Sequence, residues 1–174
     1  MSSHAIDIHI DWDGPLTSAQ IRACNTASDR GVYQVYGHHP VYGSDVLLYI
    51  GKAAGQSFAK RIPQETWWAD NRDAGRLTFY IGRLCGPATP QQAEWQRLID
   101  LAERFLISTH SPANNTQKGI ARVDANLREV HIFNYGHHRD ILPEISGARW
   151  TSKLGEMTDN IEYGSESKQK TGNT

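Results

Sequence analysis

The sequence has no apolar run that approaches the roughly 20 residues of a membrane-spanning helix, so we expect no contact with a membrane. At the N-terminus no basic segment precedes an apolar one. Residues 1–13 instead alternate isoleucine with aspartate and histidine, and a secretory signal is therefore not expected. The two cysteines, Cys24 and Cys85, are too few for a disulfide framework, and we expect both to be reduced. These absences predict a cytoplasmic protein.

The chain also lacks an excess of charge of either sign. Its 18 Lys and Arg residues and 19 Asp and Glu residues give a formal net charge of −1. Proteins that bind nucleic acid without specificity are commonly basic, because phosphate contacts dominate their affinity. The total charge therefore argues against such a binder. It leaves room for a local basic face on an otherwise acidic protein.

The composition is that of one globular domain. The chain has 174 residues, of which 39% are hydrophobic and 21% are charged, and this length suits a single core. We expect residues 1–164 to form this domain. The polar segment 165–174 is expected to be disordered, because it offers almost no apolar surface to bury.

Short segments with strand patterns recur along the chain. Ile6, Ile8 and Ile10 alternate with polar residues, which is typical of a half-buried strand, and the Asp-Gly-Pro sequence at 13–15 is expected to end it. Residues 46–50 are apolar throughout, which favours a central strand. A polar loop is predicted before this strand, over residues 37–45. Further strands are predicted over residues 32–36, 77–84 and 129–135.

Three segments have helical patterns. A short helix is expected to begin at a cap formed by Thr17 or Ser18, and a second helix is predicted over residues 52–62. A long third helix is predicted over residues 90–109, with the i, i+3, i+4 stripe of a buried face formed by Trp95, Leu98, Ile99, Ala102 and Leu106. The order of elements predicts an α+β fold with a small, central, mainly antiparallel sheet, flanking helices, and N- and C-terminal extensions.

A series of residues between positions 31 and 115 has a distinctive order. Gly31-Val32-Tyr33 is followed by Tyr49-Ile50-Gly51, and Arg61 lies ten residues after Gly51. Glu103 lies in the predicted long helix, and four residues follow it at offsets of 3, 4, 9 and 12: Leu106, Ile107, Pro112 and Asn115. This series resembles the signature of the GIY-YIG nucleases, with Val32 in place of isoleucine, and it spans about half of the chain.

The resemblance implies the GIY-YIG nuclease fold, with a catalytic core at about residues 30–118, and a metal-dependent endonuclease that hydrolyses phosphodiester bonds of DNA. It implies that Tyr33 is the general base and that Tyr49 positions the nucleophile or the phosphate. Arg61 would bind the phosphate, and Glu103 would be the sole protein carboxylate on Mg²⁺ or Mn²⁺. The other residues that the resemblance assigns to the site are Asn115, which would shape it by hydrogen bonds, and the structural glycines Gly31 and Gly51.

Physical chemistry supports parts of this assignment. Tyr33 and Tyr49, on two neighbouring antiparallel strands, can point to the same face of the sheet. A phenol has a pKa near 10 and is a poor base at neutral pH unless a nearby cation lowers that pKa. Lys52, directly after Gly51 in the sequence, is the candidate for this cation.

Two features depart from the family pattern. Glu65 lies four residues after Arg61, where many relatives carry histidine or tyrosine, and a carboxylate cannot serve there as a neutral donor. The spacer between the two tripeptides is longer than in compact members and includes residues 38–43, which is similar to the restriction-enzyme branch. Members of this branch often dimerise to make two cuts, so a homodimer is one option.

Plainer interpretations stay open at this point. Tyr33 and Tyr49 would be ordinary strand residues, Glu103 an exposed helix residue, and Arg61 a cation at the C-terminal end of a helix. Trp67-Trp68 would either stack on a nucleic acid base or cover one end of the core. The alternative functions are a catalytically inactive DNA-binding module, and a repair or toxin nuclease with the same chemistry.

Overall fold

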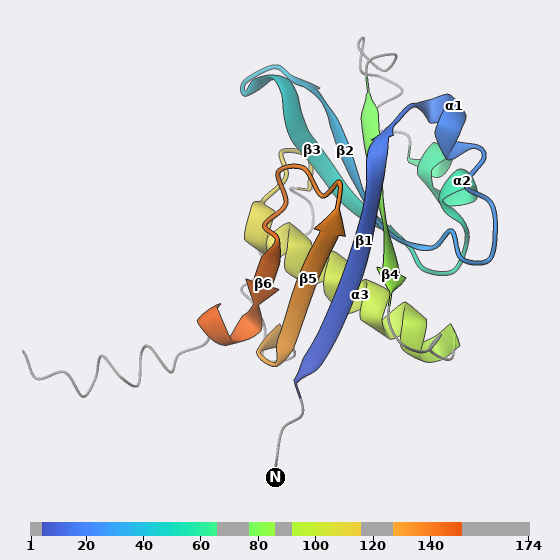
Figure 1. Cartoon of the computed structure of the whole chain (residues 1–174). Coiled ribbons are helices and arrows are strands. Elements are labelled where there is room, and N and C mark those ends of the chain that lie inside the picture. Colours follow the sequence, from blue (N-terminus) through green and yellow to red (C-terminus); the bar gives the residue numbers. More distant parts are fainter. Residues whose placement is uncertain (1–4, 66–76, 86–91, 116–126, 151–174) are drawn as a thin grey trace, which may run out of the picture.

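Six strands form one sheet in the order β3-β2-β4-β1-β5-β6 (Figure 1). The structure, a computed structural model, describes residues 5–65, 77–85, 92–115 and 127–150. Its strands are β1 (Ile6–Leu16), β2 (Gly31–His39), β3 (Gly43–Ala53), β4 (Thr78–Cys85), β5 (Val130–Gly136) and β6 (Glu144–Ser146). Its helices are α1 (Ser18–Ile21), α2 (Phe58–Arg61) and α3 (Gln92–His110), with 3-10 turns η1 (Ile62–Gln64) and η5 (Gly147–Trp150).

The sheet is mixed. β1 pairs in parallel with β5, whereas the pairs β1–β4, β2–β3, β2–β4 and β5–β6 are antiparallel. The α+β class that the sequence predicts is confirmed, and most of the strand pairs have the predicted antiparallel direction.

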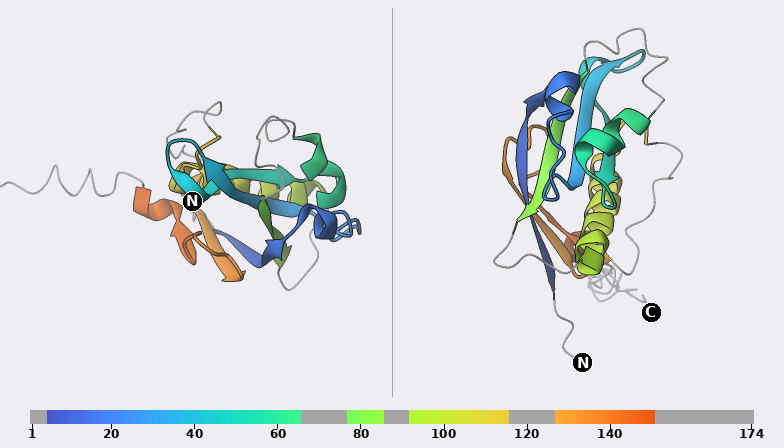
Figure 2. Two further views of the ribbon diagram at one scale, coloured as in Figure 1. Left: turned by 90° about the horizontal axis from the view of Figure 1, so that it is seen from above. Right: turned by 90° about the vertical axis from the view of Figure 1, so that its right-hand side faces the viewer.

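Helix α3 covers one face of the sheet. It crosses behind β1 and β5 in Figure 1, and Figure 2 shows it on one side of the strands. The predicted apolar stripe is confirmed, because Ile99, Ala102 and Leu106 are fully buried and Trp95 and Leu98 pack partly buried against the same core. The sheet contributes buried residues to this core from β1, β2, β3 and β5, including Ile8, Ile10, Val32, Ile50 and Ile132.

A second core lies on the opposite face of β2, β3 and β4. Ile21 of α1 and Phe58 of α2 are buried there together with Tyr33. Of the two predicted caps for α1, Thr17 is the one that the helix uses. Its hydroxyl accepts a hydrogen bond from the Gln20 backbone N–H, and the Gln20 side chain accepts one from the Thr17 backbone.

Two predicted boundaries around the first strands are wrong. β1 does not end at residues 13–15 but continues to Leu16, with a register shift between Asp13 and Leu16. Proline cannot donate to a β-ladder, and Pro15 lies where the pairing is irregular. The predicted loop 37–45 is reduced to a short turn between β2 and β3, because both strands extend into it and His39 pairs with Gly43.

The predicted helix over residues 52–62 is also largely wrong. Lys52 and Ala53 belong to β3, where they pair with Val32 and Gly31 of β2. Helix α2 begins only at Phe58, after Ser57 in extended conformation at its N-cap. Cross-strand pairing outweighs the helical pattern here, because strand preference depends on neighbours in the sheet that a local pattern does not contain.

Strand β3 is an edge strand, not the central strand that its apolar run predicts. Its free edge is covered by the segment after α3. The backbone N–H groups of Ala113 and Asn114 donate to the carbonyl oxygens of Leu47 and Leu48 at 3.2 and 2.7 Å. The buried residues of this edge strand belong to the two cores, Ile50 to the one that contains α3 and Leu48 to the one on the opposite face, and the cover at the edge blocks pairing with another chain.

Helices of the described ranges are too short or too polar to cross a membrane. Four predictions lie outside these ranges: the helix start at residue 90, the role of Trp67-Trp68, the extension of the domain to residue 164, and the tail 165–174.

Candidate active site

Tyr33 and Tyr49 lie on neighbouring strands and on the same face of the sheet. Tyr33 of β2 pairs with Gly51 of β3, two residues from Tyr49, and the two ring centroids are 6.1 Å apart. This arrangement follows the sequence-based prediction. A Cβ atom at Gly51 would lie 2.5 Å from the Tyr33 hydroxyl oxygen and 2.7 Å from the Tyr49 ring. Glycine at this position therefore makes room for both rings.

Glu65 is the group on which the two phenols converge. The hydroxyls of Tyr33 and Tyr49 donate hydrogen bonds to Glu65 Oε1 at 3.3 and 3.4 Å. The Arg61 guanidinium, one helical turn earlier, forms an ion pair with the same oxygen. Three donors from three elements thus surround one carboxylate oxygen. The sequence marks Glu65 only as a departure from a motif, and does not predict this central position.

Helix α2 and its preceding turn hold Arg61 and Glu65 in place. The backbone N–H groups of Phe58 and Ala59 donate to the carbonyl oxygens of Asp29 and Cys24, in the segment between α1 and β2, at 2.9 and 3.0 Å. The Ser57 hydroxyl donates to Asn25 Oδ1 at 2.6 Å. These bonds fix the start of α2 on a neighbouring segment, so the short helix does not depend on its own length for stability.

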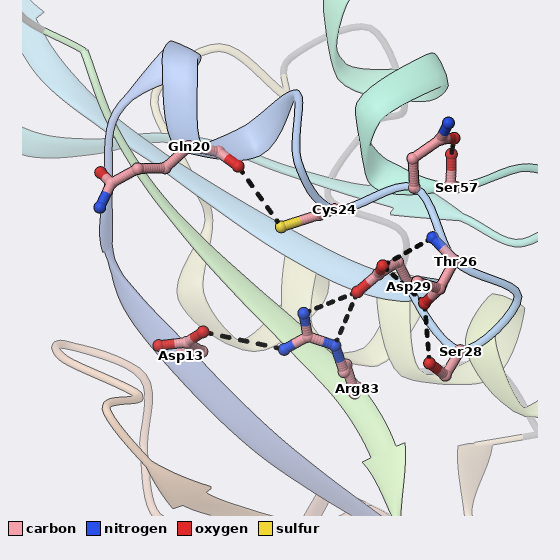
Figure 3. Close-up of polar contacts among 9 residues, drawn as sticks. Asp13, Gln20, Cys24, Thr26, Ser28, Asp29, Ser57 and Arg83 are labelled. Carbon is pink, nitrogen blue, oxygen red and sulfur yellow. Dashed lines mark hydrogen bonds and ion pairs between the residues drawn. The ribbon is translucent and has the colours of Figure 1, made fainter.

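The neighbouring segment is itself held by a polar cluster around Asp29 (Figure 3). Asp29 accepts hydrogen bonds from the backbone and hydroxyl of Thr26 and from Arg83 of β4, at 2.7 to 3.1 Å. Burial alone disfavours the Asp29 carboxylate, but these hydrogen bonds outweigh it and lower the pKa of Asp29. Arg83 also lies 3.9 Å from Asp13 of β1. The cluster ties β1, β4 and the segment before β2 together, which is a positioning role for α2.

The two phenols at the site are held in the protonated form. Burial raises the pKa of Tyr33 far above its usual value and that of Tyr49 to about 12. The negative charge of Glu65 adds to both shifts, and the positive charge of Arg61 opposes them without reversing them. Tyr33 and Tyr49 therefore act as hydrogen-bond donors in this arrangement.

Alkaline titration measures this state of the phenols. Tyr33, Tyr49 and the buried Tyr36 all have raised pKa values. By about pH 11 the folded protein should have released between two and three fewer phenolic protons than the unfolded chain, in which these groups titrate near pH 10. The contribution of each protonated phenol to the free energy of unfolding is complete below about pH 10. It is lost as the pH rises toward and through the pKa of that phenol in the folded protein. For Tyr33 and Tyr36 we expect a loss of about 1.4 kcal/mol per pH unit each.

Absorbance at 295 nm, recorded with circular dichroism to show that the fold persists, gives the number of ionised tyrosines. Ionisation of all seven tyrosines near pH 10 in the still folded protein would contradict the burial of these phenols.

A second group lies on the other side of β3 and involves α3. The Lys52 ammonium forms ion pairs with Asp100 and Glu103, and Nζ lies 2.8 Å from Glu103 Oε2. Burial alone disfavours the ammonium, but the hydrogen bonds to both carboxylates outweigh it and raise the pKa of Lys52. Glu103 is buried, with only 3% of its side chain exposed, so the interpretation as an exposed helix residue is wrong. Lys52 serves these carboxylates, and Arg61 is the cation beside the phenols.

Strand β3 connects the two groups. Tyr49 and Lys52 lie three residues apart on this strand, and the Tyr49 hydroxyl experiences the negative charges of both Glu65 and Glu103. The predicted residues Tyr33, Tyr49 and Arg61 therefore form one cluster with Glu65. Glu103 and Lys52 form an adjoining cluster with Asp100.

Asn115 fastens the backbone between these clusters. Its buried side chain accepts a hydrogen bond from the Ile50 backbone N–H and donates one to the Ile50 carbonyl, both at 2.9 Å. The amide thus replaces the backbone of a neighbouring strand at the free edge of β3. It holds the strand between Tyr49 and Gly51. Gly31 has a different structural role, because a Cβ atom there would lie 2.0 Å from the Gly82 carbonyl oxygen.

The donor set of the second cluster suits a hard divalent cation. Asp100 and Glu103 present carboxylate oxygens on one side of α3, and they already bind the positive charge of Lys52. Mg²⁺ prefers such oxygens and keeps several waters, so one or two carboxylates are enough. Among the described residues, no group of three or more His, Cys, Asp and Glu side chains is arranged to hold a metal. Mg²⁺ that is bound mainly through waters and substrate oxygens needs fewer protein ligands than such a group.

Comparison with known proteins adds no family. No family model matches the chain, and no curated protein or solved structure matches it.

Proposed function

We propose that this chain is a divalent-metal-dependent endonuclease that hydrolyses phosphodiester bonds of DNA. The observation that carries the proposal is the convergence of Tyr33, Tyr49 and Arg61, from β2, β3 and α2, on one carboxylate oxygen. These residues are far apart in the sequence, and each belongs to the motif series. Phosphodiester hydrolysis requires a positioned water and positive charge on the phosphate, and these side chains have the corresponding chemistry.

Arg61 is the phosphate-binding residue of the proposal. A guanidinium has five N–H donors, and the pairing with Glu65 uses Nη2. The guanidinium is part-exposed, with 29% of its side chain accessible, so a phosphate in solvent can reach its remaining donors. Tyr33 and Tyr49, with the carboxylate that they hold, activate and position the attacking water.

Glu103 is the metal-binding residue of the proposal, with Lys52 and Asp100 beside it. The ion pairs of both clusters contain two cations and three carboxylates, so the site has one formal negative charge in excess. A phosphodiester is also negative, and its hydrolysis at this site requires further positive charge. Bound Mg²⁺ or Mn²⁺ would supply this charge at the phosphate oxygens and polarise a water.

A catalytically inactive DNA-binding module is the second candidate. The ion pair between Lys52 and Glu103 favours it, because the ammonium already occupies one carboxylate oxygen of the proposed metal residue. A repair or toxin nuclease would use the same chemistry in another biological setting. Double-strand cutting by one such site would in addition require two copies of the chain.

Digestion of varied DNAs tests the proposal. The purified chain is incubated with supercoiled plasmid, single-stranded DNA and branched DNA in Mg²⁺, in Mn²⁺, and in EDTA. We expect nicked or linear products with either metal and none in EDTA, because the site needs the charge of the cation. The variant Arg61→Ala should lose most of the cleavage. If no DNA is cut with either metal, but DNA is bound, the inactive module is the better description.

A further inference from the structure

Glu65 is a largely buried carboxylate to which the motif gives no role. It lies directly after η1, with 15% of its side chain exposed, and Tyr33 beneath it is fully buried. Three donors reach Glu65 Oε1, from Tyr33, Tyr49 and Arg61. Solvent and substrate therefore meet the Glu65 carboxylate before they can meet the Tyr33 hydroxyl.

The two oxygens of this carboxylate are in different situations. Oε1 is surrounded by three donors, whereas no hydrogen bond from the described residues reaches Oε2. A carboxylate oxygen without a protein donor readily accepts a hydrogen bond from water. The clamp at Oε1 fixes the direction of the whole group, so a water at Oε2 would be held in one orientation.

The phenols are poor candidates for the base in this arrangement. Both hydroxyl hydrogens point to Glu65, and burial keeps the pKa of each phenol above its usual value. A phenol that donates its hydrogen to a carboxylate has to lose that hydrogen before it can accept one. The Glu65 carboxylate, by contrast, accepts hydrogen bonds from two phenols and a guanidinium, and the role of a general base is to accept a proton.

We propose that Glu65 is the general base of the hydrolysis, with Oε2 accepting the proton of the attacking water while Tyr33, Tyr49 and Arg61 hold Oε1. This proposal rests on the proposed nuclease function. The water oxygen forms a bond to phosphorus as the bond between phosphorus and the leaving oxygen breaks. The water proton moves to Glu65 Oε2, and the leaving oxygen takes a proton from solvent. Glu65 then releases its proton to solvent, and the site is restored.

Tyr33 and Tyr49 become positioning residues under this assignment. They act on the reaction through the orientation of Glu65. Removal of one phenolic hydroxyl leaves the other phenol and Arg61 on Oε1, so the base remains in place with a looser clamp. Removal of the carboxylate removes the base itself, and no phenol can replace it without a change in its protonation.

Two substitutions distinguish Glu65 from Tyr33 as the general base. In Glu65→Gln the amide keeps the shape of the side chain and accepts at one oxygen, but it cannot take a proton. We expect its single-turnover cleavage rate to fall by about 100-fold or more, with DNA affinity in Ca²⁺ within about threefold of the unaltered chain. For Tyr33→Phe we expect a loss below about tenfold. Glu144→Gln, an exposed carboxylate on β6, is the matched control for loss of charge.

Chemical rescue gives a readout that a structural role does not predict. Glu65→Ala leaves a gap beside Arg61 that a small carboxylate can enter, and added formate should restore cleavage by about tenfold or more over chloride at equal ionic strength. If the unaltered chain cuts DNA but Glu65→Gln stays within tenfold of it, or if Tyr33→Phe is the more damaging variant, Tyr33 is the base and this proposal is wrong. Absence of formate rescue in a folded Glu65→Ala also contradicts it. If the unaltered chain cuts no DNA, the nuclease function fails and this assignment fails with it.

Discussion

Glu103→Gln should abolish DNA cleavage while the protein stays folded and still binds DNA. The glutamine amide has the size of the carboxylate but no charge, so it cannot hold Mg²⁺ with useful affinity. Loss of the cation removes several kcal/mol of charge stabilisation at the phosphate, and we expect a loss of cleavage rate on the order of a thousandfold. Folding should persist because Lys52 keeps Asp100 as an ion-pair partner and can still donate to the amide oxygen.

The matched control for this variant lies on the same helix. Glu94→Gln removes a carboxylate from the first turn of α3, where Glu94 is exposed and pairs with Arg97. An exposed i,i+3 pair contributes little to stability, so this variant should cleave at the rate of the unaltered chain. Single-turnover cleavage, melting temperature and DNA affinity are measured for both variants. Full cleavage by Glu103→Gln, with unchanged dependence on Mg²⁺, would remove Glu103 from the metal site.

The elements that could be predicted from sequence are those with a strong local pattern. The stripe on α3 repeats over about three turns, and burial of one helix face is sufficient to explain it. The strand patterns in β1 and β5 are equally local. By contrast, residues 52 and 53 continue β3 because β2 lies beside them, and the apolar run at 46–50 lies on an edge strand because residues 113–115, and not a further strand, lie along its other side. The sequence of residues 46–53 alone does not show that β2 or residues 113–115 will lie beside them.

The same distinction applies to the proposed site. The common direction of Tyr33 and Tyr49 follows from the two-residue period of paired strands, and the order of the motif residues is the reason to propose roles for Arg61 and Glu103. The partners of these residues depend on tertiary structure. Glu65 meets the phenols because α2 is only one turn long and η1 follows it, whereas a helix continued from residue 52 would direct the chain elsewhere. The place of Lys52 next to Gly51 in the sequence predicts a contact with the phenols, which is wrong, because alternation along β3 points Lys52 to the α3 carboxylates.

Gly51→Ala should disturb the same site through space alone. The added Cβ would lie 2.5 Å from the Cζ and hydroxyl oxygen of Tyr33 and 2.7 Å from the ring of Tyr49. Tyr33 is fully buried, so its ring cannot withdraw into solvent, and a closely packed core resists such a change. We expect the free energy of unfolding to fall by about 1–3 kcal/mol. Displacement of one hydroxyl loosens the clamp on Glu65, as its removal does in Tyr33→Phe, so the cleavage rate should fall by up to about tenfold at a temperature where the variant is folded.

Gly55→Ala is the control for the replacement of glycine by alanine as such, because an added Cβ at this exposed glycine meets no atom within 4 Å. Its unfolding free energy should stay within about 0.5 kcal/mol of the unaltered chain, and its cleavage rate should be unchanged. Chemical denaturation and single-turnover cleavage compare the two alanine variants. Equal stability and equal activity would mean that the space above Gly51 is not filled by the two phenols. In that case the hydroxyls would not converge on Glu65, and the proton transfer assigned to that carboxylate would lose its geometric basis.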